Sequence, residues 1–127
     1  MKLNADCVRS VLLELEEKPL DNYLPEDLSE SVEKYGAENV EYTILKLQEA
    51  GYIHAGITRT LSGDYEIFGI FDITFQGHEF LNSIRSPSVW ERLKDSTLEG
   101  GTACLKVVGD IAVEILKEVA KQKLNLS

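Results

Sequence analysis

The hydrophobic residues of this chain change their spacing once, near Gly51, and this change limits the folds that the chain can adopt. Up to that point, apolar side chains recur every three or four residues, which is the repeat of an amphipathic helix. From Tyr52 to Ile73 they follow a repeat of two, interrupted by Ser62-Gly63-Asp64. A glycine-containing turn between two such runs is typical of antiparallel strands. The sequence therefore predicts helices first and a β-hairpin second.

Three helices are predicted before the hairpin. The first covers about 5–18, after the capping residue Asn4, and ends at Pro19 because proline disfavours helical geometry in the residue before it. The second begins near Pro25, whose ring is tolerated in a first turn, and closes at Gly36. The third covers about 38–51. The inner faces of the second and third helices are predicted to carry Leu24, Leu28, Val32, Val40, Ile44 and Leu47.

Further helices are predicted after the hairpin. Thr74 can cap a helix over 75–84, a short helix follows at 89–94, and Gly100-Gly101 precedes a last helix over 103–123. We interpret residues 1–99 as one module and 100–127 as a helix that packs on it or on a second subunit, within a single domain. The second strand is apolar at both alternating sets, so we expect C-terminal segments to cover its outer face.

Three helices followed by a hairpin is the element order of a winged helix-turn-helix. The segment Ile73-Thr74-Phe75-Gln76-Gly77 resembles the Leu-Thr-x-x-Gly that often follows the wing in bacterial winged-helix proteins. The predicted fold class is therefore α+β and mainly helical: a winged helix-turn-helix with three helices, a β-hairpin wing and additional C-terminal helices.

Three short motifs indicate a closer resemblance: Met1-Lys2-Leu3-Asn4-Ala5-Asp6-Cys7-Val8-Arg9, Gly77-His78-Glu79-Phe80-Leu81 and Ser88-Val89-Trp90. With them, the chain resembles an uncharacterised bacterial and phage-associated family, a domain of unknown function, from Met1 to the last helix. The resemblance implies a winged-helix core and a phage or mobile-element setting. It implies no activity, substrate or catalytic residue.

The net charge of −9 is unevenly distributed along the chain. Residues 1–51 hold 12 acidic and 5 basic side chains, a net −7; residues 52–99 are at −3 and residues 100–127 at +1. The acidity therefore belongs to the N-terminal module. Such a surface repels nucleic acid and anionic membranes at long range, although local basic clusters can override a net charge.

The outward face of the third helix decides between two functional hypotheses. In a winged helix that reads DNA, this face enters the major groove with polar and basic side chains. The candidate DNA contacts here are Asn39, Tyr42, Lys46 and Arg59, and further possible phosphate contacts are Lys2, Arg9 and Lys34. These groups could neutralise only about two to four phosphates, fewer than a tight binder uses. A DNA-binding transcriptional regulator is therefore the alternative interpretation.

The preferred hypothesis is a non-enzymatic domain for protein–protein interaction or regulation. An aromatic and an apolar residue ringed by carboxylates resemble a small protein-contact patch, because aromatic anchors carry interface energy and rim charges select partners. The candidate partner-binding residues are Glu38, Glu41, Tyr42, Leu45 and Glu49. Two plainer interpretations stay open: a solvated acidic face, or a Leu45 covered by the chain's own last helix.

The last helix is a candidate dimer interface, because its apolar stripe is wide enough to be buried on more than one side. The stripe includes Val107, Val108, Ile111, Ile115 and Leu116. We expect a homodimer through this helix, with packing across the open hairpin face as the alternative. Its polar edge is not basic enough to indicate a membrane-surface helix.

No motif for chemistry is complete. His78-Glu79 begins like a zinc-protease His-Glu-x-x-His, but Asn82 stands at the second histidine position. We therefore expect no metal, no cofactor and no enzymatic activity. Cys7 and Cys104 sit in apolar helical patterns, as small core residues do. The start of the chain lacks the apolar stretch of a signal peptide, so a soluble cytoplasmic protein is expected.

Overall fold

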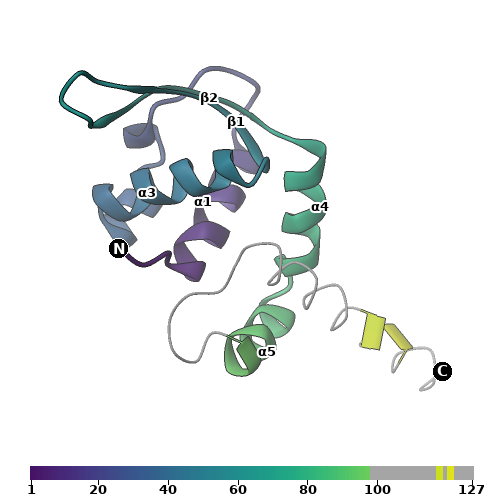
Figure 1. The fold of residues 1–127 in the computed structure, drawn as a ribbon. Helices are drawn as coiled ribbons and strands as arrows, with labels where there is room; N and C mark the ends of the chain where they lie inside the picture. The colour runs from purple at the N-terminus through teal and green to yellow at the C-terminus, as the bar shows by residue number, and fades with distance from the viewer. Residues whose placement is uncertain (98–116, 119, 122–127) are drawn as a thin grey trace.

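The computed structural model describes residues 1–97, 117, 118, 120 and 121. Its elements follow in the order α1 (Ala5–Glu17), the 3₁₀ turn η1 (Pro25–Asp27), α2 (Ser29–Tyr35), α3 (Ala37–Glu49), β1 (Ile53–Arg59), β2 (Tyr65–Ile73), α4 (Phe75–Ile84) and α5 (Pro87–Thr97) (Figure 1). The fold is therefore α+β and mainly helical, as the sequence predicts. In this part of the chain the sheet has two strands, which pair antiparallel.

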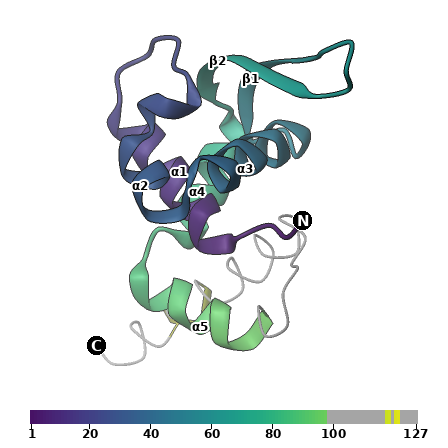
Figure 2. The same ribbon diagram turned by 90° about the vertical axis from the view of Figure 1, so that its left-hand side faces the viewer.

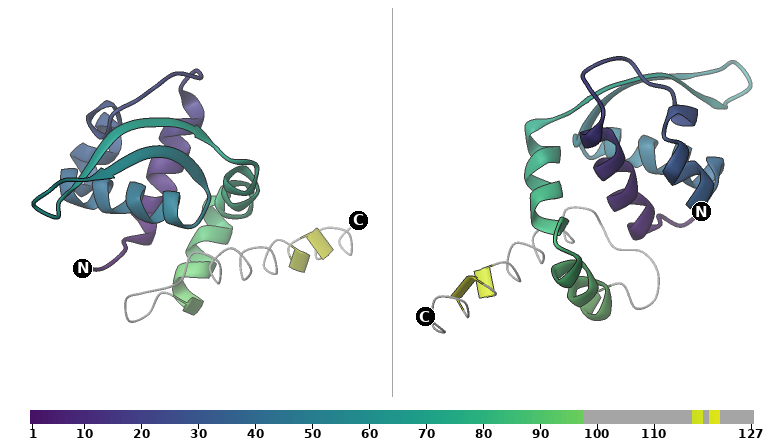
Figure 3. Two further views of the ribbon diagram at one scale, coloured as in Figure 1. Left: turned by 45° about the horizontal axis from the view of Figure 1, so that its top comes forward. Right: turned by 180° about the vertical axis from the view of Figure 1, so that it is seen from behind.

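The hairpin lies across α1 and α3, and its turn projects beyond the helices (Figure 1). Figure 3 shows α3 along the side of the hairpin formed by β1. From the base of β2 the chain passes into α4, which leads to α5 at the opposite end of the molecule from the hairpin (Figure 2). In this arrangement the outer face of α3 and the edge of β1 lie on the same side of the molecule (Figure 3).

Both predicted side-chain caps are present. The side chain of Asn4 accepts a hydrogen bond from the Cys7 amide at 3.1 Å and so begins α1. The Thr74 hydroxyl accepts from the Gly77 amide at 3.0 Å and donates to the carbonyl of Gly51 at 2.6 Å. Thr74 therefore begins α4 and also joins this helix to the end of the α3–β1 connection.

The prediction of one continuous second helix from Pro25 to Gly36 is wrong, because the helix is interrupted at Leu28. Pro25 begins only a 3₁₀ turn, which closes when Asp27 Oδ2 accepts from the Leu24 amide at 2.8 Å. Leu28 then leaves helical geometry, with φ −86° and ψ 60°, and its side chain is fully buried. Leu24, predicted to face inward, is 39% exposed. The break in the helix therefore coincides with the burial of the Leu28 side chain.

A carboxylate from α1 supplies the N-terminal cap of α2. Glu14 Oε1 accepts from the Ser31 amide at 2.9 Å and from the Ser31 hydroxyl at 2.8 Å, and Oε2 accepts from the Glu30 amide at 3.2 Å. The first amides of a helix have no partner within the helix, and a negative charge beside them is favourable. This long-range cap allows α2 to start after the break.

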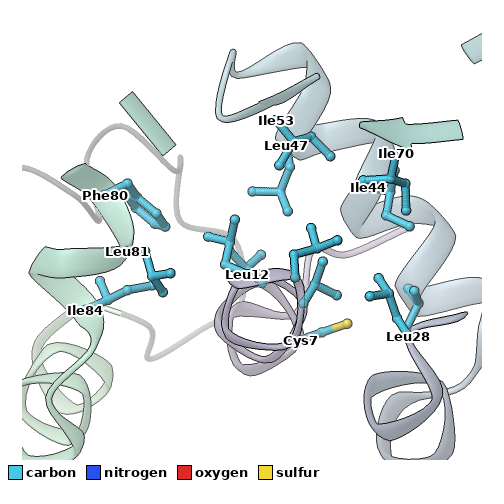
Figure 4. Packing of buried hydrophobic residues seen from close by; sticks show 14 of the residues in the cluster. Cys7, Leu12, Leu28, Ile44, Leu47, Ile53, Ile70, Phe80, Leu81 and Ile84 are labelled. Carbon is cyan, nitrogen blue, oxygen red and sulfur yellow. The ribbon is translucent and has the colours of Figure 1, made fainter. Parts of the chain in front are cut away.

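The core forms where α1 meets the other elements. Figure 4 shows Leu12 of α1 between side chains of α4 on one side and side chains of α3 and the hairpin on the other. Cys7 belongs to this core as predicted, and burial raises the pKa of its thiol. The fully buried large side chains are Leu12, Leu28, Ile44, Leu47, Ile53, Ile70, Leu81, Ile84, Leu93, Val8, Val11 and Val40.

The outer face of the hairpin carries two exposed phenylalanines, Phe68 and Phe71. Strand β2 bulges twice, and the extra residues are Phe68 and Phe71. The Phe68 ring occupies the space of a side chain at Gly56, and the Phe71 ring that of one at Gly69. These glycines are paired across the strands, so both rings lie on one face. Phe68 is 52% and Phe71 39% exposed. Most of the C-terminal segment predicted to cover this face lies outside the described residues.

Arg9, a possible phosphate contact in the sequence, has a structural role. Its Nε donates to the carbonyl of Ile84 at 3.0 Å and its Nη2 to that of Arg85 at 2.7 Å, at the end of α4. Its guanidinium lies 6.0 Å from the centre of the Trp90 ring. The Trp90 indole in turn donates to Asp6 Oδ1 at 2.7 Å. These contacts join α1, α4 and α5.

A second contact between α1 and α4 gives a prediction about pH. Arg85 Nη2 donates to Glu16 Oε2 at 2.6 Å, and this hydrogen bond holds the pKa of Glu16 below its ordinary value. The pair therefore stabilises the fold above the ordinary glutamate pKa, and its contribution disappears as the pH falls through the lowered value. We expect Arg85→Gln to lower the free energy of unfolding at neutral pH by less than about 1 kcal/mol. Urea unfolding should show a larger difference at pH 7 than in strong acid, where the hydrogen bond from Arg85 Nη2 to Asn82 Oδ1 at 2.8 Å remains but the pair with Glu16 is lost. A difference equally large in acid would contradict this prediction.

The candidate dimer residues Val107, Val108, Ile111, Ile115 and Leu116 lie outside the described residues, as do most of 100–127 and the division at residue 99/100. Residues 117, 118, 120 and 121 are helical, and Arg92 Nη2 contacts Glu118 Oε2 at 3.4 Å. Among the helices described, none combines the length and apolarity that crossing a membrane requires.

Candidate partner-binding site

A groove of about 1070 Å³ separates the outer face of α3 from the hairpin. All five candidate partner-binding residues line it, so the structure brings together Glu38, Glu41, Tyr42, Leu45 and Glu49. The remaining lining residues are Met1, Lys46, Gln48, Ala55, Ile57, Asp64 and Tyr65. The groove is therefore a joint product of one helix and one hairpin. Figure 3 shows α3 and the hairpin side by side.

The helical repeat of α3 explains which side chains reach the groove. Val40, Thr43, Ile44 and Leu47 are buried against the core and fix the rotation of the helix. The opposite face then carries the candidates: Tyr42 and Leu45 are half-buried, whereas Glu38, Glu41 and Glu49 are exposed. The apolar side chains are therefore the more buried part of the groove, and the carboxylates form its exposed rim.

The groove carries four carboxylates against one lysine. Glu38, Glu41, Glu49 and Asp64 line it, and among the described residues that line it Lys46 is the single lysine or arginine. The Lys46 ammonium donates to Glu49 Oε2 at 2.9 Å, and this hydrogen bond raises the pKa of Lys46. Four carboxylates against one ammonium give the groove a net negative charge, and the lysine already has Glu49 as its anionic partner.

The candidate DNA contacts are already engaged within the protein. Asn39 Nδ2 donates to the carbonyl of Tyr35 at 2.7 Å. Lys46 lies 5.5 Å from the centre of the Tyr42 ring, in addition to its pairing with Glu49. The Arg59 guanidinium lies 5.0 Å from the centre of the Tyr65 ring, and its Nη2 donates to the Tyr65 hydroxyl at 3.3 Å. A phosphate would have to compete with these partners. Of the four residues, Tyr42 and Lys46 line the groove.

The sequence interpretation missed the hairpin side of this groove. Ala55 and Ile57 are two residues apart on β1, so their side chains share one face, and both line the groove. Gln48, at the end of α3, is uncharged. Its Oε1 accepts a hydrogen bond from the Ala55 amide at 2.7 Å. The alternation along the strand could have revealed Ala55 and Ile57; the Gln48 contact depends on the three-dimensional fold.

Two histidines lie outside this groove, His54 on the hairpin and His78 on α4. His54 Nδ1 and Asp72 Oδ1 form a pair at 2.7 Å on the surface of the hairpin. His78 lines a smaller hollow of about 300 Å³ between the end of α1 and β2, together with Phe71 and Tyr23. In the part of the chain that the structure describes, no three His, Cys, Asp or Glu side chains gather as a metal site requires.

Comparison with known proteins agrees with the motifs in the sequence. Residues 2–103 match the model of a family described as "Hypothetical protein (DUF2513)". The chain belongs to this family. This DUF2513 protein is also 32% identical over 123 residues to an uncharacterized protein of Haemophilus influenzae, a match that covers 95% of this chain and 93% of that protein. No solved structure matches it.

In this DUF2513 protein, the motifs that carry the resemblance support the fold. Asn4 caps α1, Cys7 lies in the core, and Arg9 binds the end of α4. Phe80 stacks on Tyr52 with ring centres 4.7 Å apart. Apart from Met1, residues of the three motifs do not line the groove. In this protein the named motif residues therefore hold the elements together, and the groove has to be interpreted from its own chemistry.

Proposed function

We propose that this DUF2513 protein is a non-enzymatic, winged-helix-like domain that binds a protein partner through the groove between α3 and the hairpin. Support for a winged-helix-like arrangement comes from the element order, in which three helices precede an antiparallel hairpin that lies along the third helix. In this interpretation α3 has the position of a recognition helix and the hairpin that of a wing. Its outer surface, however, carries carboxylates.

The composition of the groove is the observation that carries the proposal. Tyr42 and Leu45 offer half-buried apolar surface, and Glu38, Glu41 and Glu49 surround them. Apolar anchors inside a charged rim are a common form of protein-binding surface, in which the rim charges select the partner. The complementary partner carries basic residues beside an apolar one.

The alternative is a DNA-binding regulator, of a phage gene or otherwise, that uses Asn39, Tyr42, Lys46 and Arg59. The element order favours this alternative, since winged helices that read DNA share it. Electrostatics opposes it, because DNA affinity depends on cations that replace the counterions of the phosphates. Here the cations are few and are paired with groups of the protein.

The double variant Glu38→Gln/Glu41→Gln separates the two functions. We expect the wild-type protein not to bind labelled mixed-sequence duplex DNA. Fluorescence anisotropy at about 50 and 200 mM salt would measure this binding. The regulator interpretation instead requires salt-sensitive micromolar binding by the wild type that tightens in the double variant. Glu30→Gln/Glu33→Gln on α2 is the matched control, because it makes the same change in net charge at exposed positions that do not line the groove.

A further inference from the structure

We propose that the partner enters the groove as an extended, lysine- or arginine-rich segment that pairs with the edge of β1 as a third strand. The inference rests on the proposed function, because it specifies the chemistry and the conformation of the partner at the same groove. Its basis is the direction in which the backbone groups of β1 point, together with the charges beside them.

Three hydrogen bonds establish the alternation along β1. The Tyr52 carbonyl accepts from the Thr74 amide at 3.0 Å, and the Thr60 amide donates to the Asp64 carbonyl at 2.7 Å, so residues 52 and 60 face β2. The Ala55 amide points the other way, because it donates to Gln48. In an antiparallel ladder the backbone N–H and C=O groups of successive residues point alternately toward the partner strand and away from it. The backbone groups of Ala55, Ile57 and Arg59 therefore face away from β2.

This outward edge of β1 is open beyond Ala55. In the described residues the sheet ends at β1, so no further strand pairs with Ile57 and Arg59. The opposite edge of the sheet is different: Ile70 of β2 exchanges two backbone hydrogen bonds with Tyr23, at 3.0 and 2.7 Å. Among the described residues only Ile70 of that edge is bonded in this way, so we place the added strand on β1 because the carboxylates of the groove lie beside it. Addition of a peptide strand to an exposed sheet edge is a recurring mode of recognition.

The edge and the acidic groove adjoin each other. Ala55 and Ile57 supply outward backbone groups, and their side chains line the groove opposite α3. Every second side chain of an added strand would point to the same face, at a spacing of about 6.6 Å. Those side chains would meet Glu38, Glu41, Glu49 and Asp64 with Tyr42 and Leu45 between them. Lysine or arginine at alternate positions, with an apolar residue among them, matches this surface.

Three peptides of equal charge test the inference with the full-length protein. The first is a labelled ten-residue peptide that alternates lysine and valine. The second contains the same number of lysines in an alanine- and leucine-rich helical sequence. The third is the first peptide with N-methyl groups on the amides of one edge, which removes donors but no charge. Anisotropy at low salt measures affinity, and amide hydrogen exchange by NMR reports on Ile57 and Arg59.

We expect the extended peptide to bind at least about tenfold more tightly than the helical and N-methylated ones, and to slow exchange of the Ile57 and Arg59 amides. Glu38→Gln/Glu41→Gln should weaken its binding by about tenfold, whereas Glu30→Gln/Glu33→Gln should not. Equal affinity for the extended and helical peptides, each weakened by Glu38→Gln/Glu41→Gln, would overturn strand pairing and leave the proposed function standing. Lack of binding by all three, or binding that Glu38→Gln/Glu41→Gln leaves unchanged, would overturn both.

Discussion

Replacing Gly77 by alanine is expected to lower the free energy of unfolding by about 2–3 kcal/mol. A Cβ at this position would lie 1.9 Å from the carbonyl oxygen of Tyr52 and 2.7 Å from Cγ2 of Ile73. The carbonyl cannot move away freely, since it accepts a hydrogen bond from Thr74. Inserting a methyl group into a packed core typically costs about 1–3 kcal/mol, and because this contact is far too short and its oxygen belongs to the backbone, we expect a cost above that range, about 3–4 kcal/mol. The higher helix propensity of alanine offsets at most about 1 kcal/mol of this cost.

Thermal unfolding followed by circular dichroism would measure this effect as a drop in Tm of about 10 °C. Gln76→Ala is the control, because this neighbouring residue of α4 is exposed and its replacement should change the stability by less than about 0.5 kcal/mol. A Gly77→Ala protein as stable as the wild type would mean that α4 does not pack this closely against the end of the α3–β1 connection.

Replacing Arg9 by methionine is expected to cost about 2 kcal/mol. Methionine keeps much of the apolar stem beside Trp90 but removes the hydrogen bonds to the carbonyls of Ile84 and Arg85. A hydrogen bond from a charged group contributes about 1.5–3 kcal/mol when buried. Because the bond to Arg85 is exposed and that to Ile84 is partly buried, the sum stays near the lower limit.

Denaturant unfolding would measure the change, with Arg9→Lys and Lys2→Met as comparisons. Lysine keeps the charge but lacks the two directed donors of a guanidinium, so an intermediate loss is expected. Lys2 is exposed at the start of the chain, and its replacement should have little effect. If Arg9→Met were neutral in stability and instead weakened binding to DNA, the structural role assigned to Arg9 would be wrong.

The sequence predicts the elements whose limits depend on local chemistry. Asn4 and Thr74 begin helices through their own side chains, and Ser62-Gly63-Asp64 separates the two strands as expected. The outward face of α3 also follows from a single repeat. All five candidate partner-binding residues therefore lie together along the groove.

Features that depend on contacts between distant residues escaped prediction. The break at Leu28 is stabilised by Glu14, which is 17 residues before Ser31 along the chain. The bulges that place Phe68 and Phe71 over Gly56 and Gly69 depend on the register between two strands. Periodicity within one segment carries no information about either arrangement.

The family motifs also have a physical interpretation that the sequence alone did not supply. In this protein Asp6 and Arg9 of the first motif bind Trp90 and the end of α4, and Gly77 of the second lies where Tyr52 leaves no room for a side chain. The motifs therefore describe how helices meet, which explains why they resemble a family without indicating a chemistry.

The open edge of β1 also bears on self-association. Exposed strand edges can pair with the same edge of another copy, and charged side chains beside an edge are a common protection against it. If two copies paired through β1, the carboxylates of Glu38, Glu41, Glu49 and Asp64 from both grooves would be brought close together. Repulsion between these eight groups opposes such a pair. The side chains that would attract a basic strand thus also keep two hairpins of this protein apart.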